Sequence, residues 1–219
     1  MEEDDDIPQL STDTLKALQE FRLEQSEKEL KLMEIMKQSN PVDISNLSFG
    51  EDWQLSQFWY CEETAISLAK AATKVVGYKG NIALISCPTL YKHIKALAPD
   101  CKVSLLEYDS RFAVIAGEAF VQYDYNFPLD VPRELASQCD LVLMDPPFLS
   151  EECLTKTSVT AKFLAKNKIV LCTGAVMEDF AMRLLDLKKC SFEPKHQNNL
   201  ANKFYCFANF DLDSVLSNL

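Results

Sequence analysis

The chain has 219 residues, of which 47% are hydrophobic and 25% are charged, and its formal net charge is −11. This length and composition are typical of one main globular domain that buries most of its apolar surface. The acidic start MEEDDDIPQL lacks the basic flank and apolar core of a signal peptide, and no apolar run approaches the roughly 18 residues that cross a bilayer, so a cytoplasmic protein without membrane contact is expected.

The negative charge is uneven along the chain. Residues 1–50 contain 12 acidic and 5 basic residues, and the rest of the chain is closer to neutral. A protein that binds nucleic acid through its phosphates needs a basic surface, so this charge argues against DNA or RNA as a partner and favours a basic protein.

The eight cysteines lie at least 14 residues apart, which excludes a CxxC metal knuckle or redox pair. Most of them lie in apolar stretches such as residues 85–87 and 170–172, where a reduced cysteine packs as a small hydrophobic residue. No metal site is expected.

The first predicted element is a helix over about residues 11–38, within an acidic N-terminal extension that comprises residues 1–50. Ser, Thr and Asp at its start can cap a helix, and Asn40-Pro41 can end it. Its apolar residues follow one helical face only loosely, which favours a partly solvated helix docked on the main domain over a partner-binding arm.

The main domain, residues 51–219, begins with an aromatic cluster in the sequence WQLSQFWY at 53–60, which runs into a helix that ends near Gly77. Such a cluster is usually part of a core, but ahead of a first strand it can also line a ligand pocket. Trp59 is the candidate pocket residue of this cluster.

Short apolar strands then alternate with helices. Strands are predicted at 81–87, 102–109, 118–125, 139–145, 167–174, 190–196 and 202–210, and helices at 88–98, between 126 and 138, at 150–165 and at 176–187. This alternation indicates an α/β fold with a mostly parallel sheet, both faces of which are covered by helices. The last two strands have no helix between them and predict an antiparallel hairpin at the edge.

Ligands of such sheets bind at the carboxyl ends of the strands, where the strand order reverses. The first turn lacks GxGxxG, which argues against a dinucleotide, whereas S-adenosylmethionine carries no phosphate and its carboxylate can bind near the helix N-terminus that Pro88 opens. Glu107 lies at the interval expected for a ribose-binding acid, with Asp109 as the alternative, and Asp124 can accept a hydrogen bond from the adenine amino group. The candidate cofactor residues are Trp59, Ser86, Cys87, Pro88, Glu107, Asp109, Asp124 and Tyr125.

The strongest motif is Asp145-Pro146-Pro147-Phe148, which directly follows a predicted buried strand. A strand-ending turn would account for the prolines but not for the acid or the ring. A site that methylates an amine accounts for all four candidate catalytic residues. Asp145 and the carbonyl of Pro146 can orient the amine, the prolines fix the turn, and Phe148 can pack against the target or its cation.

Several blocks of sequence closely resemble the eukaryotic elongation factor 1-alpha lysine methyltransferase family, whose members were first named as adenine-N6 DNA methyltransferases because of this tetrapeptide. The blocks are WQLSQFWY at 53–60, LLEYDSRF at 105–112, YDYNFPLDVP at 123–132, DPPFLSEECLTKTS at 145–158, LCTGAVME at 171–178 and NLANKFYCF at 199–207. The resemblance implies that residues 51–219 form a Rossmann-like class I methyltransferase domain with seven strands. It also implies S-adenosylmethionine as donor and a lysine of elongation factor 1-alpha, a basic protein, as acceptor. We expect a monomer.

Three other functions stay open at this point: adenine-N6 methylation of DNA or RNA, which the tetrapeptide alone favours; glutamine methylation; and a binding module without catalysis. The charge of −11 argues against the first, because flipping a base requires basic residues at the phosphates. The two histidines, His93 and His196, are expected on the surface without a catalytic role.

Overall fold

The computed structural model describes residues 15–16, 19–20, 23, 50–198 and 200–219. The chain divides into two units, Met1–Asp43 and Ile44–Leu219. In the first unit the described residues, Leu15 to Leu23 with gaps, are helical and exposed, while most of the helix predicted over 11–38 lies outside the described residues. All further description concerns the second unit.

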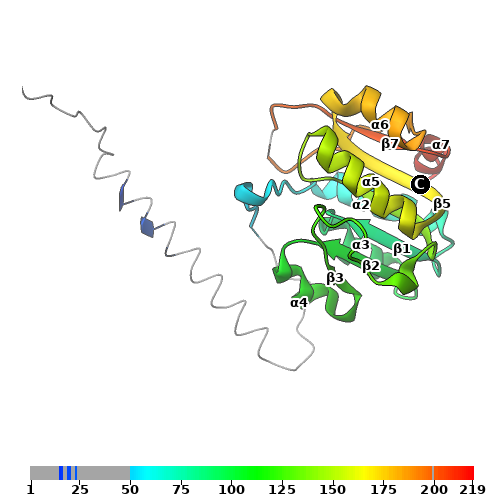
Figure 1. The fold of residues 1–219 in the computed structure, drawn as a ribbon, viewed down its shortest axis with the longest axis horizontal. Coiled ribbons are helices and arrows are strands. Elements are labelled where there is room, and N and C mark those ends of the chain that lie inside the picture. Colours follow the sequence, from blue (N-terminus) through cyan, green and yellow to red (C-terminus); the bar gives the residue numbers. More distant parts are fainter. Residues whose placement is uncertain (1–14, 17–18, 21–22, 24–49, 199) are drawn as a thin grey trace, which may run out of the picture. The chain divides into compact units, whose positions relative to one another are not determined.

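A seven-stranded sheet with the order β3-β2-β1-β4-β5-β7-β6 forms the centre of this unit (Figure 1). The first five strands in this order run parallel, and β7 and β6 are antiparallel to their neighbours. The strands are β1 Asn81–Ile85, β2 Lys102–Glu107, β3 Phe120–Gln122, β4 Cys139–Met144, β5 Ala165–Gly174, β6 Lys188–Lys189 and β7 Phe204–Ala208. The predicted α/β fold with an antiparallel edge is therefore confirmed.

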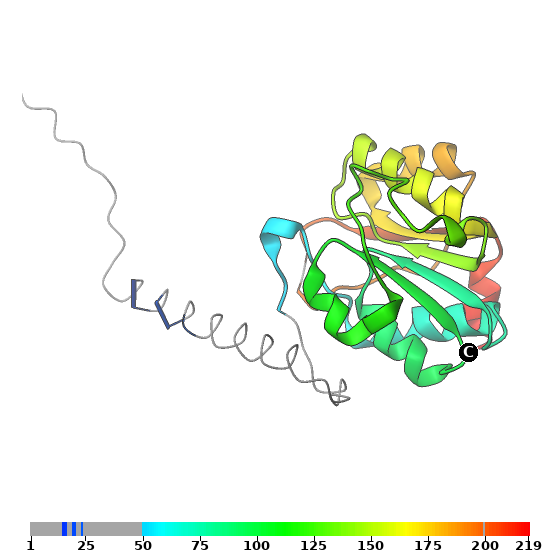
Figure 2. The same cartoon turned by 60° about the horizontal axis from the view of Figure 1, so that its bottom comes forward.

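Helices cover both faces of the sheet, with α2 and α3 on one side and α5 and α6 on the other (Figures 1 and 2). The α-helices are α2 Glu62–Val75, α3 Thr89–Leu97, α4 Ala113–Ala116, α5 Glu151–Leu164, α6 Glu178–Leu185 and α7 Leu212–Ser217. Short 3-10 turns are η2 Trp53–Leu55, η3 Ser110–Phe112, η4 Gly117–Ala119, η5 Arg133–Leu135 and η6 Ala175–Met177.

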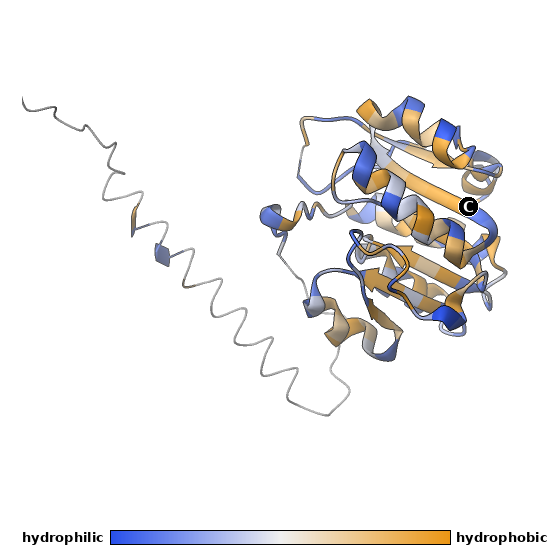
Figure 3. Cartoon of the chain, viewed as in Figure 1, coloured by the Kyte–Doolittle hydropathy of each residue, from blue (hydrophilic) through white to orange (hydrophobic). Residues whose placement is uncertain are grey.

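Alternate residues of each strand point to opposite faces, so the domain has two cores. In β1, Ile82 and Leu84 pack toward α2 and α3, whereas Ala83 and Ile85 pack toward α5 and α6. Figure 3 shows the hydrophobic colour along the central strands and mixed colours on the helices. Because both faces are covered, the central strands contain apolar runs such as residues 82–85 of β1 and 141–144 of β4, which is why they could be predicted from sequence.

Two predicted elements are wrong in position. The strand predicted at 190–196 is replaced by the short β6, because Pro194 has no N–H to donate to a ladder. His196 instead forms an isolated antiparallel bridge with Tyr60. The helix predicted between 126 and 138 is only the 3-10 turn η5, since the segment is interrupted by Pro128 and Pro132.

Sheet order reverses between β1 and β4, which are hydrogen-bonded neighbours. Chains that leave two such strands diverge to opposite faces, and the crevice between them is the usual ligand site of this architecture. Ser86 and Asp145 are the first residues after these two strands. No helix in the described part of the chain is long and apolar enough to span a membrane.

Substitution of Phe207 tests the packing of β7 against the core. The side chain of Phe207 has 0% exposure and lies in the core beneath α6. We expect Phe207→Ala to lower the free energy of unfolding by about 3 to 5 kcal/mol, through lost burial and the cavity that remains. Val176→Ala, at a position that is 74% exposed, should change it by less than about 0.5 kcal/mol in the same denaturant titration. Equal effects of the two substitutions would contradict this packing.

Candidate active site

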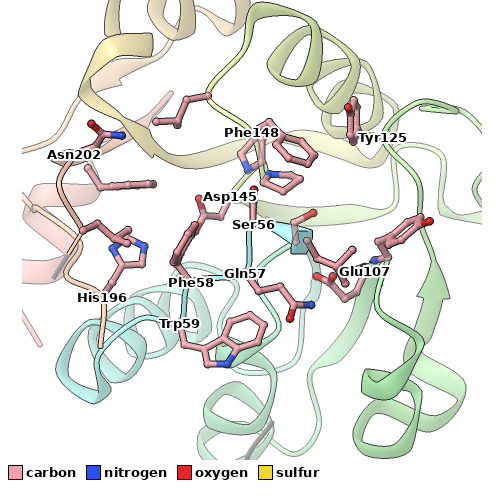
Figure 4. A pocket seen from close by; sticks show the side chains of 18 of the residues that line it. Ser56, Gln57, Phe58, Trp59, Glu107, Tyr125, Asp145, Phe148, His196 and Asn202 are labelled. Carbon is pink, nitrogen blue, oxygen red and sulfur yellow. Dashed lines mark hydrogen bonds between the residues drawn. The ribbon is translucent and has the colours of Figure 1, made fainter. Parts of the chain in front are cut away.

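A cavity of about 560 Å³ lies at the carboxyl ends of the parallel strands (Figure 4). Its walls come from the ends of β1, β2, β3 and β4 and from two further parts of the chain, residues 55–59 and the group His196, 200–202 and Phe204. This volume lies within the range of about 300 to 1,000 Å³ that small-molecule sites occupy. The strand ends therefore form a ligand-sized site at the switch point.

Nine of the twelve predicted site residues line this cavity: Trp59, Ser86, Glu107, Asp124, Tyr125, Asp145, Pro146, Pro147 and Phe148. Figure 4 shows Asp145 near the middle, with Glu107 and Tyr125 on one side and His196 and Asn202 on the other. Cys87, Pro88 and Asp109 do not line it. Apart from Trp59, the predicted residues thus lie along the strand ends that form one side of the cavity, although three of the candidates lie behind its wall.

The first turn explains the positions of Cys87 and Pro88. Ser86 has a φ of 55°, a left-handed conformation that is uncommon for a residue with a side chain, and its N–H donates to the carbonyl of Leu106 at 2.9 Å. The chain then turns inward, so Cys87 is buried and its thiol contacts the carbonyl of Leu143 at 3.6 Å. Burial raises the pKa of this thiol, which therefore behaves as a core residue. Pro88 precedes α3, as predicted.

Asp109 is committed to a structural network. Its carboxylate accepts hydrogen bonds from the guanidinium of Arg111 and from Nε2 of Gln57 at 2.9 Å. These bonds, with Arg111 foremost among the charged partners, hold the pKa of Asp109 below its ordinary value despite burial. Gln57 in turn accepts from the backbone N–H of Asp52 at 3.1 Å. Asp109 therefore anchors the segment ahead of α2, and of the two candidate ribose-binding acids only Glu107 lines the cavity.

Glu107 ends β2 as a buried carboxylate with 6% exposure. Its Oε1 accepts from the backbone N–H groups of Tyr108 at 3.1 Å and Asp109 at 3.3 Å. No residue in the described ranges donates to its Oε2. Burial raises the pKa of Glu107 to about 7, although the two N–H groups act in the opposite direction. This is a desolvated acid with one oxygen available to a ligand.

Asp145 follows β4, and its backbone N–H donates to the carbonyl of Ile85 in β1 at 3.0 Å. Its Oδ2 accepts a hydrogen bond of 2.5 Å from the hydroxyl of Tyr60. Burial raises the pKa of Asp145 to about 7, and the Tyr60 hydroxyl works against that rise. The geometry can hold an amine, because a carboxylate at this position faces the cavity beside two rigid prolines and the ring of Phe148.

The side of the cavity beyond Asp145 was largely missed from sequence. It contains Phe58, His196, Leu200, Asn202 and Phe204, and the rings of His196 and Phe204 lie 4.5 Å apart. Burial lowers the pKa of His196 to about 4, so this ring is neutral at pH 7 and is not the surface residue that was expected. The aromatic cluster at 53–60 and the block at 199–207 were the available signals, but the bridge between Tyr60 and His196 is not visible in a sequence.

His93 is also less exposed than predicted. It is partly buried on α3, where it lies 3.7 Å from Glu62, and burial lowers its pKa. It lies outside the cavity. Its expected lack of a catalytic role stays a prediction.

The charges around the cavity are of one sign. Among the described residues its lining includes the carboxylates Glu107, Asp124 and Asp145, and no Lys or Arg. Such a lining attracts a cation and has no cationic side chain to pair with a phosphate. This distinguishes the site from one that anchors a nucleic acid near the reacting group.

Comparison with known proteins agrees with this geometry. Residues 51–212 match the family model described as "Probable N6-adenine methyltransferase". The chain is 50% identical over 215 residues to the mouse (Mus musculus) EEF1A lysine methyltransferase 1, with 95% of each chain covered. It is 36% identical to a protein-lysine N-methyltransferase of Saccharomyces cerevisiae, with 94% of this chain and 93% of that protein covered.

Among solved structures, a branched-chain polyamine synthase of Thermus thermophilus has a similar fold. It superposes with a TM-score of 0.54 at 15% identity, over 73% of this chain and 59% of that one. At this identity the likeness concerns the fold alone.

The buried acid Glu107 gives a stability prediction. Because its pKa in the folded chain is about 7 against an ordinary 4.5, its charged form is disfavoured by folding. This penalty is absent below about pH 4.5 and fully present above about pH 7. Glu107→Gln should therefore be more stable than the parent at pH 8, by on the order of 1 to 3 kcal/mol, and similar to it at pH 4.5.

Denaturant unfolding at several pH values measures this difference. Glu118→Gln is the matched control, since Glu118 is exposed and its substitution should have little effect at either pH. A Glu107→Gln variant whose stability difference does not grow with pH would contradict the raised pKa.

Proposed function

This chain belongs to the family of the EEF1A lysine methyltransferases, and we propose that it transfers a methyl group from S-adenosylmethionine to a lysine of elongation factor 1-alpha. The observation that carries the proposal is the position of Asp145: a carboxylate at the end of β4, inside a cavity whose other charges are also negative. Relatives with names of protein-lysine N-methyltransferases match the chain over most of its length, and adenine-N6 methylation is not favoured by them.

The half of the cavity at β1, β2 and β3 suits the cofactor. We assign Oε2 of Glu107, which has no donor within the described ranges, to the ribose hydroxyls, and Asp124 and Tyr125 to the adenine. The turn at Ser86 borders the same half of the cavity, and Trp59, in the segment ahead of α2, forms another part of its wall. Cys87 and Pro88 contribute only by shaping that turn, and Asp109 by anchoring Gln57. When bound, S-adenosylmethionine supplies a methyl group on a sulfonium centre.

The residues of the chain prepare the amine. A lysine ammonium has a pKa near 10.4 in water, so it must be attracted as a cation and then lose a proton before its nitrogen can react. Asp145 meets both needs, because its carboxylate attracts the ammonium and its raised pKa, about 7, lets it accept a proton at neutral pH. We assign orientation of the nitrogen to Asp145 and the carbonyl of Pro146.

Phe148, which is 40% exposed, and its neighbours form the apolar surroundings of this point. Pro146 is buried, Pro147 is half-buried, and the ring of Phe148 packs edge-on against Tyr125 with 5.8 Å between centroids. The apolar residues Phe58, Leu200 and Phe204 lie on the far side of Asp145 and can pack along the methylenes of a lysine. In this scheme Asp145 and the carbonyl of Pro146 orient the amine, and the ring of Phe148 packs beside it.

We further propose that the protein acts in the cytoplasm and as a monomer. All eight cysteines are free, which suits a reducing compartment, and elongation factor 1-alpha is a cytoplasmic substrate. The lining of the cavity comes from one chain, so no second subunit is needed to complete it.

The proposed reaction is tested with labelled S-adenosylmethionine, offered with purified elongation factor 1-alpha and with a pool of DNA and RNA. We expect label on the protein, and a loss of at least about 100-fold with Asp145→Ala, because that variant lacks the group that holds the amine. Asp100→Ala removes an exposed acid after α3 and should keep full activity. Label on nucleic acid would instead support adenine methylation.

The cofactor assignment has its own test, titration of S-adenosylmethionine by calorimetry. Glu107→Gln should weaken binding by about tenfold or more, because a hydrogen bond to a charged acceptor is lost, whereas Asp145→Ala should change affinity by no more than a few fold. Unchanged affinity in Glu107→Gln would remove this residue from the cofactor site, and no binding to the parent protein would mean a module without catalysis.

A further inference from the structure

Tyr60 has a role that its sequence context does not reveal. It lies in the short connection between η2 and α2, with 3% of its surface exposed. Its hydroxyl reaches across 85 positions of sequence to donate to Oδ2 of Asp145 at 2.5 Å. Burial and the nearby carboxylate of Asp145 raise the pKa of Tyr60 above its ordinary value of 10, so the hydroxyl keeps its proton and stays a donor throughout the neutral range.

The backbone on both sides of Tyr60 is clamped. The N–H of Gln197 donates to the carbonyl of Trp59 at 2.8 Å, and the N–H of Cys61 donates to the carbonyl of Lys195 at 2.9 Å. Between these bonds Tyr60 pairs with His196, and their rings lie 5.2 Å apart. The ring therefore has a fixed position, and its hydroxyl has a fixed direction.

Asp145 is otherwise free to turn. Its backbone is fixed by β1, but within the described ranges Tyr60 is the one residue that hydrogen-bonds its carboxylate. The bond engages Oδ2, and among the described residues none donates to Oδ1. Oδ1 is therefore the oxygen whose two acceptor positions are both open to a ligand in the cavity.

From this geometry we infer that Tyr60 is a positioning residue, which holds Oδ2 of Asp145 so that Oδ1 is presented to the lysine nitrogen as a charged acceptor. The inference rests on the proposed lysine methylation. Tyr60 touches neither substrate nor reacting atoms in this scheme. It acts through Asp145, by fixing the plane of the carboxylate and by stabilising its negative charge with a hydrogen bond.

The surroundings make this donor important. The titratable groups around the pair of Tyr60 and Asp145 are Cys87 after β1, Glu107 of β2, Cys172 of β5 and His196 of the bridge. His196 is neutral at pH 7, since burial lowers its pKa to about 4, and Glu107 adds negative charge when ionised. The Tyr60 hydroxyl is the group that lowers the pKa of Asp145 against the effect of burial.

Tyr60→Phe removes the donor and keeps the ring. Without it the pKa of Asp145 should rise by about one unit, as expected for one hydrogen bond to a charged group. The acid limb of kcat/KM, which reports the free enzyme, should move up by about one pH unit. Activity at pH 7 should fall about fivefold, because the ionised fraction of Asp145 falls from about one half to about one eleventh, and it should approach that of the parent near pH 9. The lysine substrate titrates equally with both proteins, so it does not produce this difference.

Tyr91→Phe is the matched control. Tyr91 is a half-buried tyrosine whose hydroxyl donates to the carbonyl of Ala116 at 3.3 Å, outside the cavity. It should keep the pH profile of the parent. A loss in Tyr60→Phe that is the same at every pH, or no loss, would overturn the inference and leave Tyr60 with a packing role.

A carbon NMR titration of aspartate carboxyl groups measures the same property without substrate. The signal of Asp145, assigned by its absence in Asp145→Asn, should titrate about one unit higher in Tyr60→Phe than in the parent. An unchanged midpoint overturns the inference. If the parent titrates as expected but does not methylate elongation factor 1-alpha, the proposed function fails and the pairing of Tyr60 with Asp145 stands.

A further measurement does not depend on how Tyr60→Phe folds. In the parent, the buried hydroxyl proton of Tyr60 should give a protected downfield NMR signal, as a short bond to a carboxylate does. The signal should move upfield in Asp145→Asn, where the acceptor is neutral. A signal that does not respond to this substitution would show that Tyr60 bonds elsewhere.

Discussion

A carboxylate removed from water is costly, and the architecture of the site follows from how that cost is limited at Asp145. The last four residues of the strand that precedes it, 141–144, are apolar and buried on both faces, so the acid emerges at the edge of a dry sheet rather than in open solvent. One backbone bond to β1 fixes the main chain and one hydroxyl fixes the side chain. The remaining cost appears as a raised pKa, which is the property that a base for a lysine ammonium requires.

Glu107 is also a carboxylate removed from water, but its hydrogen bonds come from the backbone and not from a side chain. Two backbone N–H groups satisfy one of its oxygens, and the other faces the cavity. The two acids therefore store unfavourable solvation energy that a bound ligand with hydroxyl or ammonium donors can relieve. The same unsatisfied oxygens lower the stability of the unliganded chain and give it affinity for such ligands. The two effects therefore have one physical origin.

The sequence predicted the parts of the molecule that depend on local pattern. Apolar strands of a doubly covered sheet, the acid after β4 and the acid at the end of β2 could each be found from spacing and composition, and the family resemblance agreed with them. The structural role of Asp109 could not be predicted in this way. It stands two residues after Glu107 and has the same charge, yet its position beside Arg111 and Gln57 commits it to a network. That choice depends on a contact between residues 52 positions apart, for which no sequence pattern exists.

The far wall of the cavity was missed for a related reason. Residues 59–61 and 195–197 pair through two backbone hydrogen bonds, which form the bridge between Tyr60 and His196, although one segment precedes the first strand and the other precedes the last. Glu51 strengthens this junction by accepting hydrogen bonds from the N–H of Trp59 at 2.8 Å and from the side chain of Asn198 at 2.6 Å.

The sheet and the junction thus contribute different parts of the site. The sheet supplies the two acids, Glu107 and Asp145, from strands that could be predicted from the sequence pattern. The junction supplies Tyr60 and His196, which decide how one of those acids is oriented and what lies beside it. Because the junction is separate from the sheet's own hydrogen bonding, its residues can change the acceptor side of the cavity while the half formed by β1, β2 and β3 stays as it is. The choice of acceptor in this fold is therefore expected to reside in the connections at 51–61 and 195–204 more than in the strands.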